Sequence, residues 1–131
     1  MIRLRRLDHL VLTVRDMAAT RAFYTRVLGM REITFGEGRK ALLFDRQKIN
    51  LHPADAPYPP HAAAPTPGSA DICLLAEPPM ADILRHLRAC GVPVEEGPVR
   101  RTGATGPILS VYIRDPDGNL LEISVPADEA G

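Results

Sequence analysis

The sequence predicts an α+β fold of two βαβββ modules, whose mixed sheets form a cup with the helices outside. Three observations support this prediction. A strand-like run followed by an amphipathic helix occurs twice, and the glycines that end the two helices, Gly29 and Gly91, are 62 residues apart. His9 and Asp71, at the two strand starts, have the same separation. A proline-rich segment, 53–68, lies between the two copies.

The first module covers about residues 5–52. The run LDHLVLTV at 7–14 is aliphatic and β-branched, which predicts a strand. Asp16 is a suitable N-cap for a helix over 17–28. Three short strands are expected to follow, at about 30–35, 40–45 and 48–52.

Residues 53–68 hold six of the thirteen prolines and predict an extended connector, because proline lacks the donor that helices and sheets need. The second module, about 69–126, begins with a strand over 70–76 and a helix over 80–90. The extra ten residues of this module are expected in a loop at 95–107. Its remaining strands are expected near 92–95, 109–114 and 120–125. The two modules together are expected to form a single domain over residues 1–131.

Composition excludes several classes of partner. Sixteen basic residues balance sixteen acidic ones, which argues against nucleic acid or an anionic membrane as the main partner. No stretch approaches the ~20 apolar residues of a membrane span, and no signal peptide is recognisable. Two cysteines cannot form a disulfide framework. A reducing cytoplasm is therefore the expected location.

A few polar side chains interrupt the otherwise apolar strands, and they are the candidates for a site inside the cup. Two histidines with one carboxylate have the composition of a metal site with open coordination positions. Each residue also has a structural explanation, since a lone strand histidine is often only hydrogen-bonded and Asp71 could bond to backbone. The candidates are His9, Asn50, His52, Asp71 and Glu122.

Other chemical groups carry less specific signals. His61 in the connector and His86 on the second helix are interpreted as structural or solvated. Two basic pairs, Arg39-Lys40 and Arg100-Arg101, could bind a carboxylate or phosphate, although solvated loop charge is the commoner role. Cys73 alternates onto the face of Asp71 and is interpreted as a packed thiol.

Two segments resemble a known family. LDHLVLTVRDMAATRAFYTRVLGM resembles the opening of the vicinal oxygen chelate superfamily of glyoxalases, bleomycin-resistance proteins and extradiol dioxygenases. RDPDGNLLEIS resembles its closing signature, and the segments between them resemble the glyoxalase-domain branch that includes bacterial virulence proteins. The resemblance covers about residues 7–125.

The resemblance implies the glyoxalase fold, a divalent metal (zinc, nickel, manganese or iron) and a homodimer. Its ligand positions fall on His9, Asn50, Asp71 and Glu122. Glyoxalase I usually has a carboxylate at the position of Asn50, and both glyoxalase I and the extradiol dioxygenases have a histidine at that of Asp71. His9, His52 and Glu122 are therefore expected as metal ligands, with Glu122 and Asp71 as the groups that move protons.

The function implied is a metal-dependent enzyme acting on a small oxygenated molecule, with lyase or isomerase chemistry ahead of dioxygenase chemistry. The alternative is a metal-free protein that sequesters a drug, like the bleomycin-resistance proteins. Because neutral Asn50 cannot accept a proton, weak turnover of the methylglyoxal–glutathione adduct is expected.

Overall fold

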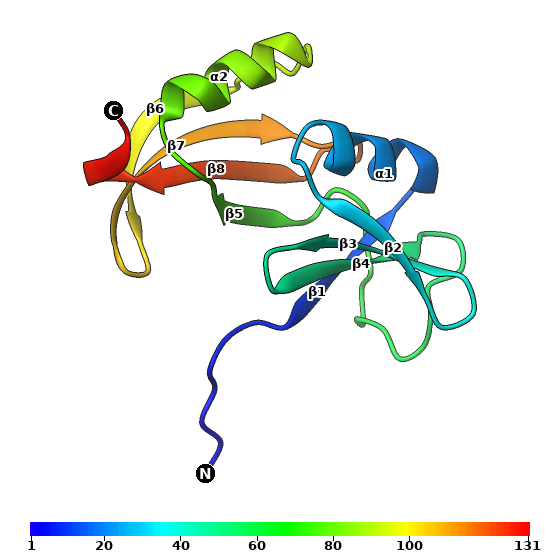
Figure 1. Ribbon diagram of the computed structural model, residues 1–131. Helices are drawn as coiled ribbons and strands as arrows, with labels where there is room; N and C mark the ends of the chain where they lie inside the picture. Colours follow the sequence, from blue (N-terminus) through cyan, green and yellow to red (C-terminus); the bar gives the residue numbers. More distant parts are fainter. The chain divides into compact units, whose positions relative to one another are not determined.

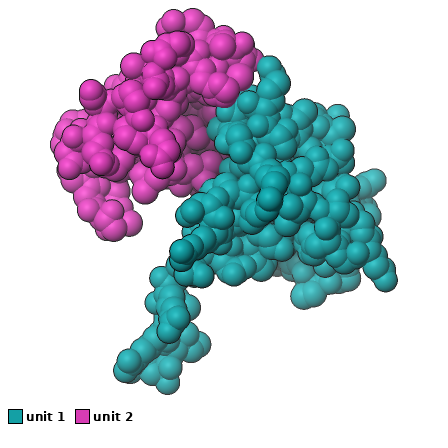
Figure 2. Space-filling view, viewed as in Figure 1, with its two compact units in different colours: residues 1–67 teal, residues 68–131 magenta.

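The computed structural model describes residues 1–131 and divides into two compact units, Met1–Pro67 and Gly68–Gly131 (Figure 2). Each unit contains one long helix and one four-stranded mixed sheet in the order βαβββ (Figure 1). The predicted α+β class and the internal repeat are thereby confirmed. The expectation that both units function as one domain stays a prediction.

Unit 1 has strand order β1-β4-β3-β2, with β1 parallel to β4 and the other pairs antiparallel. The Asp16 side chain caps α1 by accepting a hydrogen bond from the backbone N–H of Ala19 at 3.0 Å. The helix ends two residues before the predicted position, and the backbone of Gly29 beyond it is left-handed, with φ 69°. The elements are β1 His9–Val14, α1 Met17–Arg26, β2 Arg31–Phe35, β3 Arg39–Phe44 and β4 Gln47–Pro53.

Unit 2 repeats this topology, with strand order β5-β8-β7-β6 and β5 parallel to β8. Figure 1 shows α1 on one face of the first sheet and α2 on one face of the second. Each helix is ten residues long, and neither is long and apolar enough to cross a membrane. The elements are β5 Asp71–Leu75, α2 Met80–Ala89, β6 Glu96–Gly103, β7 Gly106–Arg114, β8 Leu120–Pro126 and a final 3₁₀ turn Ala127–Glu129.

Strand alternation separates the two faces of each sheet. In unit 1, Leu12, Leu42 and Leu51 share the side of the sheet that faces α1 and are almost fully buried, as is Tyr24 of α1. In unit 2, Val111, Leu121 and their neighbours form the equivalent buried face. We call the opposite sides, which carry His9, Asn50 and His52 in unit 1 and Asp71 and Glu122 in unit 2, the open faces.

One predicted element is wrong. The strand expected at 92–95 lies instead at Glu96–Gly103, within the segment expected to be a loop. This segment contains glycine, proline and arginine, which predict a loop, but it pairs with β7 as an edge strand and has a register shift between Glu96 and Val99. Gly97 in the shift has φ 103° and lies too close to the Ser110 carbonyl for any Cβ.

The proline-rich connector is also different from the prediction, because residues 54–70 form turns and bends instead of one extended run. The closing turn follows its sequence signal. The Asp115 carboxylate accepts hydrogen bonds from the backbone N–H groups of Asp117 and Asn119 and from the Asn119 side chain, at 2.8–2.9 Å. Asn119 in turn accepts a bond from the Ala70 N–H at 2.8 Å, which fixes the start of β5.

Candidate functional site

The open face of unit 1 holds three of the residues singled out from the sequence. In the β1–β4 register, His9 lies opposite Lys48, Val11 opposite Asn50 and Thr13 opposite His52. Opposed residues share one side of a sheet, so both histidines and Asn50 lie on the same side, as period two predicts.

His9 has the arrangement of an oriented ligand. Its imidazole is 43% exposed, and its Nδ1 lies 2.9 Å from the Asp8 carboxylate. This hydrogen bond is the first cause of the lowered pKa of Asp8. Because the carboxylate accepts a proton at Nδ1, the lone pair of Nε2 faces away from it and is available to a metal or a substrate.

His52 is held differently. Its side chain is 3% exposed, and an N–H of the Arg39 guanidinium lies 3.3 Å from Nε2. Since arginine only donates, Nε2 accepts and the proton is on Nδ1, which is buried without a partner. Burial, then the charge of Arg39, then His61 lower the pKa of His52, so the ring is neutral near pH 7. The lone pair that a metal would need is therefore occupied by Arg39.

Asn50 lies between Val11 and Ala41 in the centre of this sheet and is 7% exposed. Its side-chain oxygen is buried and has no hydrogen-bond partner. An orphaned buried acceptor of this kind is costly and is common where a ligand or ion completes a site.

A pocket of about 430 Å³ is lined by residues of β1, β4 and the connector. His52 lies in its wall, and the proline-rich connector contributes His61, for which the sequence predicts a structural or solvated role. The residues lining it are Val11, Thr13, His52, Pro60, His61, Ala62 and Pro65.

The open face of unit 2 carries a chain of hydrogen bonds that ends at Glu122. The Ser110 hydroxyl donates to Glu122 Oε2 at 2.6 Å. Ser110 has one proton, so at 2.7 Å from the Ser124 hydroxyl it must accept. Ser124 then accepts from the Cys73 thiol at 3.3 Å. Because Glu122 accepts at the end of this chain, each group donates to the next one, in the order Cys73, Ser124, Ser110 and Glu122.

Both serines are fully buried, whereas Glu122 is half-buried. Burial, opposed by the Ser124 hydrogen bond and assisted by the charge and the hydrogen bonding of Glu122, raises the pKa of the Cys73 thiol. Asp71 lies on the same face, is exposed, and forms no hydrogen bond, so the backbone-bonding explanation does not hold for it.

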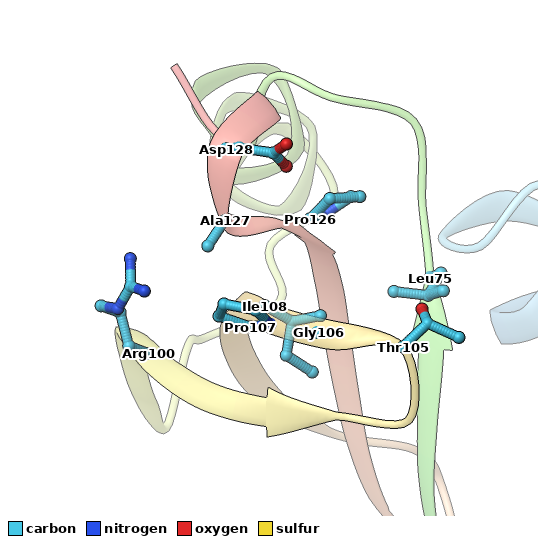
Figure 3. A pocket seen from close by; sticks show the side chains of 9 residues that line it. All are labelled: Leu75, Arg100, Thr105, Gly106, Pro107, Ile108, Pro126, Ala127 and Asp128. Carbon is cyan, nitrogen blue, oxygen red and sulfur yellow. The ribbon is translucent and has the colours of Figure 1, made fainter.

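Glu122 and Cys73 line a pocket of about 470 Å³, a size typical of small-molecule sites. Arg101 also lines it, and its charge is directed to Glu96 at 2.6 Å and to the Tyr112 hydroxyl at 2.9 Å. A neighbouring pocket of about 380 Å³ (Figure 3) shares three residues with it and has Arg100 and Asp128 in its wall. The shared residues are Leu75, Thr105 and Ile108.

The predicted ligands are thus divided between the units, with His9 and His52 in unit 1 and Asp71 and Glu122 in unit 2. Neither unit by itself brings three histidine, cysteine or acidic side chains into the geometry of a metal site. The set His9, His52 and Glu122 stays a prediction.

Several residues that organise these faces carry no distinct sequence signal. Ser110 and Ser124 are ordinary strand residues until the register aligns them. The sequence favours solvated charge for Arg39, but its guanidinium stacks 4.4 Å from the Tyr58 ring centroid and contacts His52. This contact joins an arginine and a histidine on adjacent strands, so it could be predicted only once the register of those strands was known.

A family model described as the glyoxalase/bleomycin resistance protein/dioxygenase superfamily matches residues 6–123. Virulence protein STM3117 of Salmonella typhimurium is 55% identical over 119 residues, 91% of this chain and 83% of that protein. Its crystal structure has a TM-score of 0.94, covering 96% of this chain and 100% of that one at 52% identity. Glyoxalase domain-containing protein RDO1 of Mycosarcoma maydis is 56% identical over 92% of this chain and 68% of its own length.

More distant structures share the fold. Lactoylglutathione lyase from Agrobacterium tumefaciens has a TM-score of 0.73 at 25% identity, over 94% of this chain and 95% of that one. The antibiotic binding protein TnmS3 from Streptomyces has a TM-score of 0.75 at 18% identity, over 97% and 100% of the two chains. One fold therefore carries both a lyase and a binding protein.

Proposed function

Because this chain belongs to the glyoxalase/bleomycin resistance protein/dioxygenase superfamily, we propose that it is a divalent-metal-dependent enzyme acting on a small oxygenated molecule. Lyase or isomerase chemistry is preferred over dioxygenase chemistry. A lactoylglutathione lyase at 25% identity supports this order, although the substrate of that enzyme is not carried over.

The observation that carries the proposal is a pair of oriented, unoccupied donor atoms. His9 has its Nδ1 held by Asp8, and Glu122 has its Oε2 held by Ser110. Each therefore has one donor atom, Nε2 of His9 or Oε1 of Glu122, that this outer hydrogen bond leaves available. Metal ligands are typically oriented by such outer hydrogen bonds.

The donor set fits a divalent metal of the zinc, nickel, manganese or iron type, because it combines imidazole with carboxylate. His9 and Glu122 would hold it, and His52 would be the third ligand once Arg39 released its Nε2. The bound metal would supply Lewis-acid polarisation of two substrate oxygens.

Proton transfer falls to the carboxylates of unit 2. Asp71 is exposed and free of hydrogen bonds, so it can accept a substrate proton without losing a structural contact. Glu122 can do the same through Oε1 when that atom is not a ligand. Ser110 keeps the carboxylate of Glu122 in one orientation at 2.6 Å, which favours a defined direction of transfer.

Metal content tests the proposal. Protein purified without chelator should contain one divalent metal per site by elemental analysis, and His9→Ala or Glu122→Ala should release it while unfolding stays cooperative. His86→Ala on α2 is the matched control, because it removes an imidazole outside both open faces. Stoichiometric metal in both site variants would place the metal elsewhere.

The methylglyoxal–glutathione adduct tests the reaction. Neutral Asn50 stands at the position of a family carboxylate, and loss of a general base costs about 10²–10⁴ in rate. We expect weak turnover of this adduct with nickel, zinc, manganese, cobalt or iron. Turnover comparable to an authentic glyoxalase I with any of these metals would overturn this expectation.

The second candidate is a metal-free protein that sequesters a drug or metabolite. The pocket of about 470 Å³ beside Glu122 favours it, since it is large enough for a small molecule. No aromatic side chain lines that pocket, which argues against a planar drug held by stacking. Protein free of metal after purification, and unable to take up any of the five metals, would favour this candidate.

We also propose that the protein is a homodimer. Each sheet has an open face and unpaired edge strands, β1 and β2 in unit 1 and β5 and β6 in unit 2. Exposed apolar side chains such as Val11 and Leu75 lie on two of these edges. Sedimentation at micromolar concentration should give the mass of two chains, and a monomer would contradict the proposal.

A further inference from the structure

The two sides of the first sheet differ sharply in charge. Strand alternation places three cationic residues, Arg31, Arg39 and Lys48, on the open face of unit 1, together with the two histidines. No strand position on that face holds a carboxylate. The strand carboxylate of this unit, Glu32, is on the helix side and pairs with Arg21 at 3.1 Å and Lys40 at 3.8 Å.

Arg39 is fixed in place but mostly unsatisfied. Its guanidinium carbon lies 4.4 Å from the Tyr58 ring centroid and 5.4 Å from that of Phe35, and one N–H contacts His52. The remaining N–H groups of its planar fork have no protein partner, and Arg39 forms no ion pair. Stacked, half-buried guanidinium groups are preorganised, so little entropy is lost when they bind an anion.

Lys48 lies at the same aromatic ring. Its Nζ is 4.1 Å from the Phe35 centroid, so Phe35 contacts two cations, Lys48 and Arg39. Lys48 is close enough to contribute to the lowered pKa of Asp8, yet it forms no ion pair with that carboxylate, which is bonded to His9. Two half-buried cations that form no ion pair attract anions, because a protein surface screens them less than water does.

We propose that the open face of unit 1 binds the carboxylate or phosphate group of an anionic small molecule, with Arg39 as the forked donor and Lys48 as the second cation. The identification of this molecule with the substrate rests on the proposed function. Arginine binds both oxyanions through paired N–H donors, whereas the lysine adds charge with little directional preference. Within the proposed function, such a site would restrict the substrate from any small oxygenated molecule to one that carries a carboxylate or phosphate group.

The test uses the full chain, treated with chelator so that no metal can bind the probes. Sodium malonate and inorganic phosphate are titrated separately at constant ionic strength, and backbone amide shifts are followed by NMR. We expect saturable shifts at Phe35, Arg39 and His52, with uncharged malonamide giving none. Saturation by malonate alone identifies a carboxylate site, and saturation by phosphate alone identifies a phosphate site.

Three variants that each remove one positive charge separate local from global electrostatics. Arg39→Gln should weaken binding about tenfold or more, and Lys48→Met several-fold, as loss of a charge-assisted contact does. Lys40→Gln is the control, because Lys40 bonds to Thr34 at 2.8 Å on the other face, and it should bind as the unchanged protein does. Arg39→Lys keeps the charge but loses the paired N–H donors, so its affinity should lie between those of Arg39→Gln and the unchanged protein. It takes the place of Arg39→Gln in the test if that variant does not fold.

Either of two results overturns the site: no saturable shift up to about 50 mM anion, or equal affinity in the Arg39 and Lys40 variants. Because the titration contains no metal, it fails or succeeds separately from the metal content of the protein. Anion binding without metal uptake would retain this site and reject the metal-dependent enzyme.

Discussion

Ser110→Ala should weaken metal binding and destabilise unit 2, because this hydroxyl holds Glu122. Ser110 is fully buried on β7 and donates to Glu122 Oε2 at 2.6 Å. It also accepts from Ser124 at 2.7 Å. Alanine removes both contacts while keeping the Cβ and the strand, so the change acts on hydrogen bonding alone.

The magnitude follows from the two contacts. A hydrogen bond to a charged group contributes about 1.5–3 kcal/mol, and a buried hydroxyl that loses its acceptor costs about 1–3 kcal/mol. Half-buried Glu122 can recover part of its loss from water, whereas Ser124 keeps only the weak contact with Cys73. We expect a loss of about 2–3 kcal/mol in the free energy of unfolding, and about 10–100-fold in metal affinity.

Two measurements on matched variants test this. Urea unfolding gives the stability, and competition with a chelator of known affinity gives the dissociation constant for the metal. Ser124→Ala is the control, because it removes the other fully buried hydroxyl of this hydrogen-bond chain but leaves the bond between Ser110 and Glu122 intact. It should lose stability and keep the metal affinity of the unchanged protein.

The reasoning is refuted if Ser110→Ala loses stability but keeps its metal affinity. Glu122 would then not be a ligand, and the hydrogen-bond chain would be structural only. Equal losses of metal affinity in both serine variants would also contradict it, since general loosening of the sheet would explain both.

Three further predictions concern pH, thiol reactivity and the closing turn. The folded pKa of His52 lies below its unfolded value of 6.5, so the unfolded chain takes up the proton first and stability should decrease as the pH falls through 6.5; His52→Gln should flatten this decrease in urea unfolding with chelator present. Cys73 in a Cys90→Ser background should react with iodoacetamide at pH 8 more slowly than in urea, and Glu122→Gln should accelerate it by removing a negative charge. Asn119→Ala should cost about 2–3 kcal/mol by thermal or urea unfolding, because it removes the buried hydrogen bond to the Asp115 carboxylate and the bond accepted from the Ala70 N–H.

The topology follows from the sequence because each module has strong local signals. Glycines end both helices, and the period of two along a strand is enough to place Asn50 and His52 on one face. The sequence is misleading at β6, where pairing with β7 outweighs a composition that predicts a loop. An edge strand has one partner and one solvent-exposed side, so it tolerates residues that a central strand does not.

The candidate site is less predictable, because metal ligation depends on which ring nitrogen or carboxylate oxygen is available and not only on the residue type. His9 and His52 are equivalent in the sequence, yet one imidazole has a carboxylate at Nδ1 and the other has a guanidinium at Nε2. The difference depends on Arg39, which is 13 residues from His52 in the chain and on the adjacent strand. No local pattern encodes that contact.

The repeat explains why the two open faces differ in charge. The register places Ala41 opposite Asn50 in unit 1 and Tyr112 opposite Glu122 in unit 2. Arg39 lies two residues before Ala41 on β3, and Ser110 lies two residues before Tyr112 on β7. The same position of the repeated βαβββ unit therefore supplies a hydrogen-bond donor in both units. In one unit that donor is a cation beside a neutral histidine, and in the other it is a hydroxyl beside a carboxylate. One strand geometry therefore yields a hydrogen-bond donor of different charge in each unit, because the register fixes where the donors lie and the residue type fixes their charge.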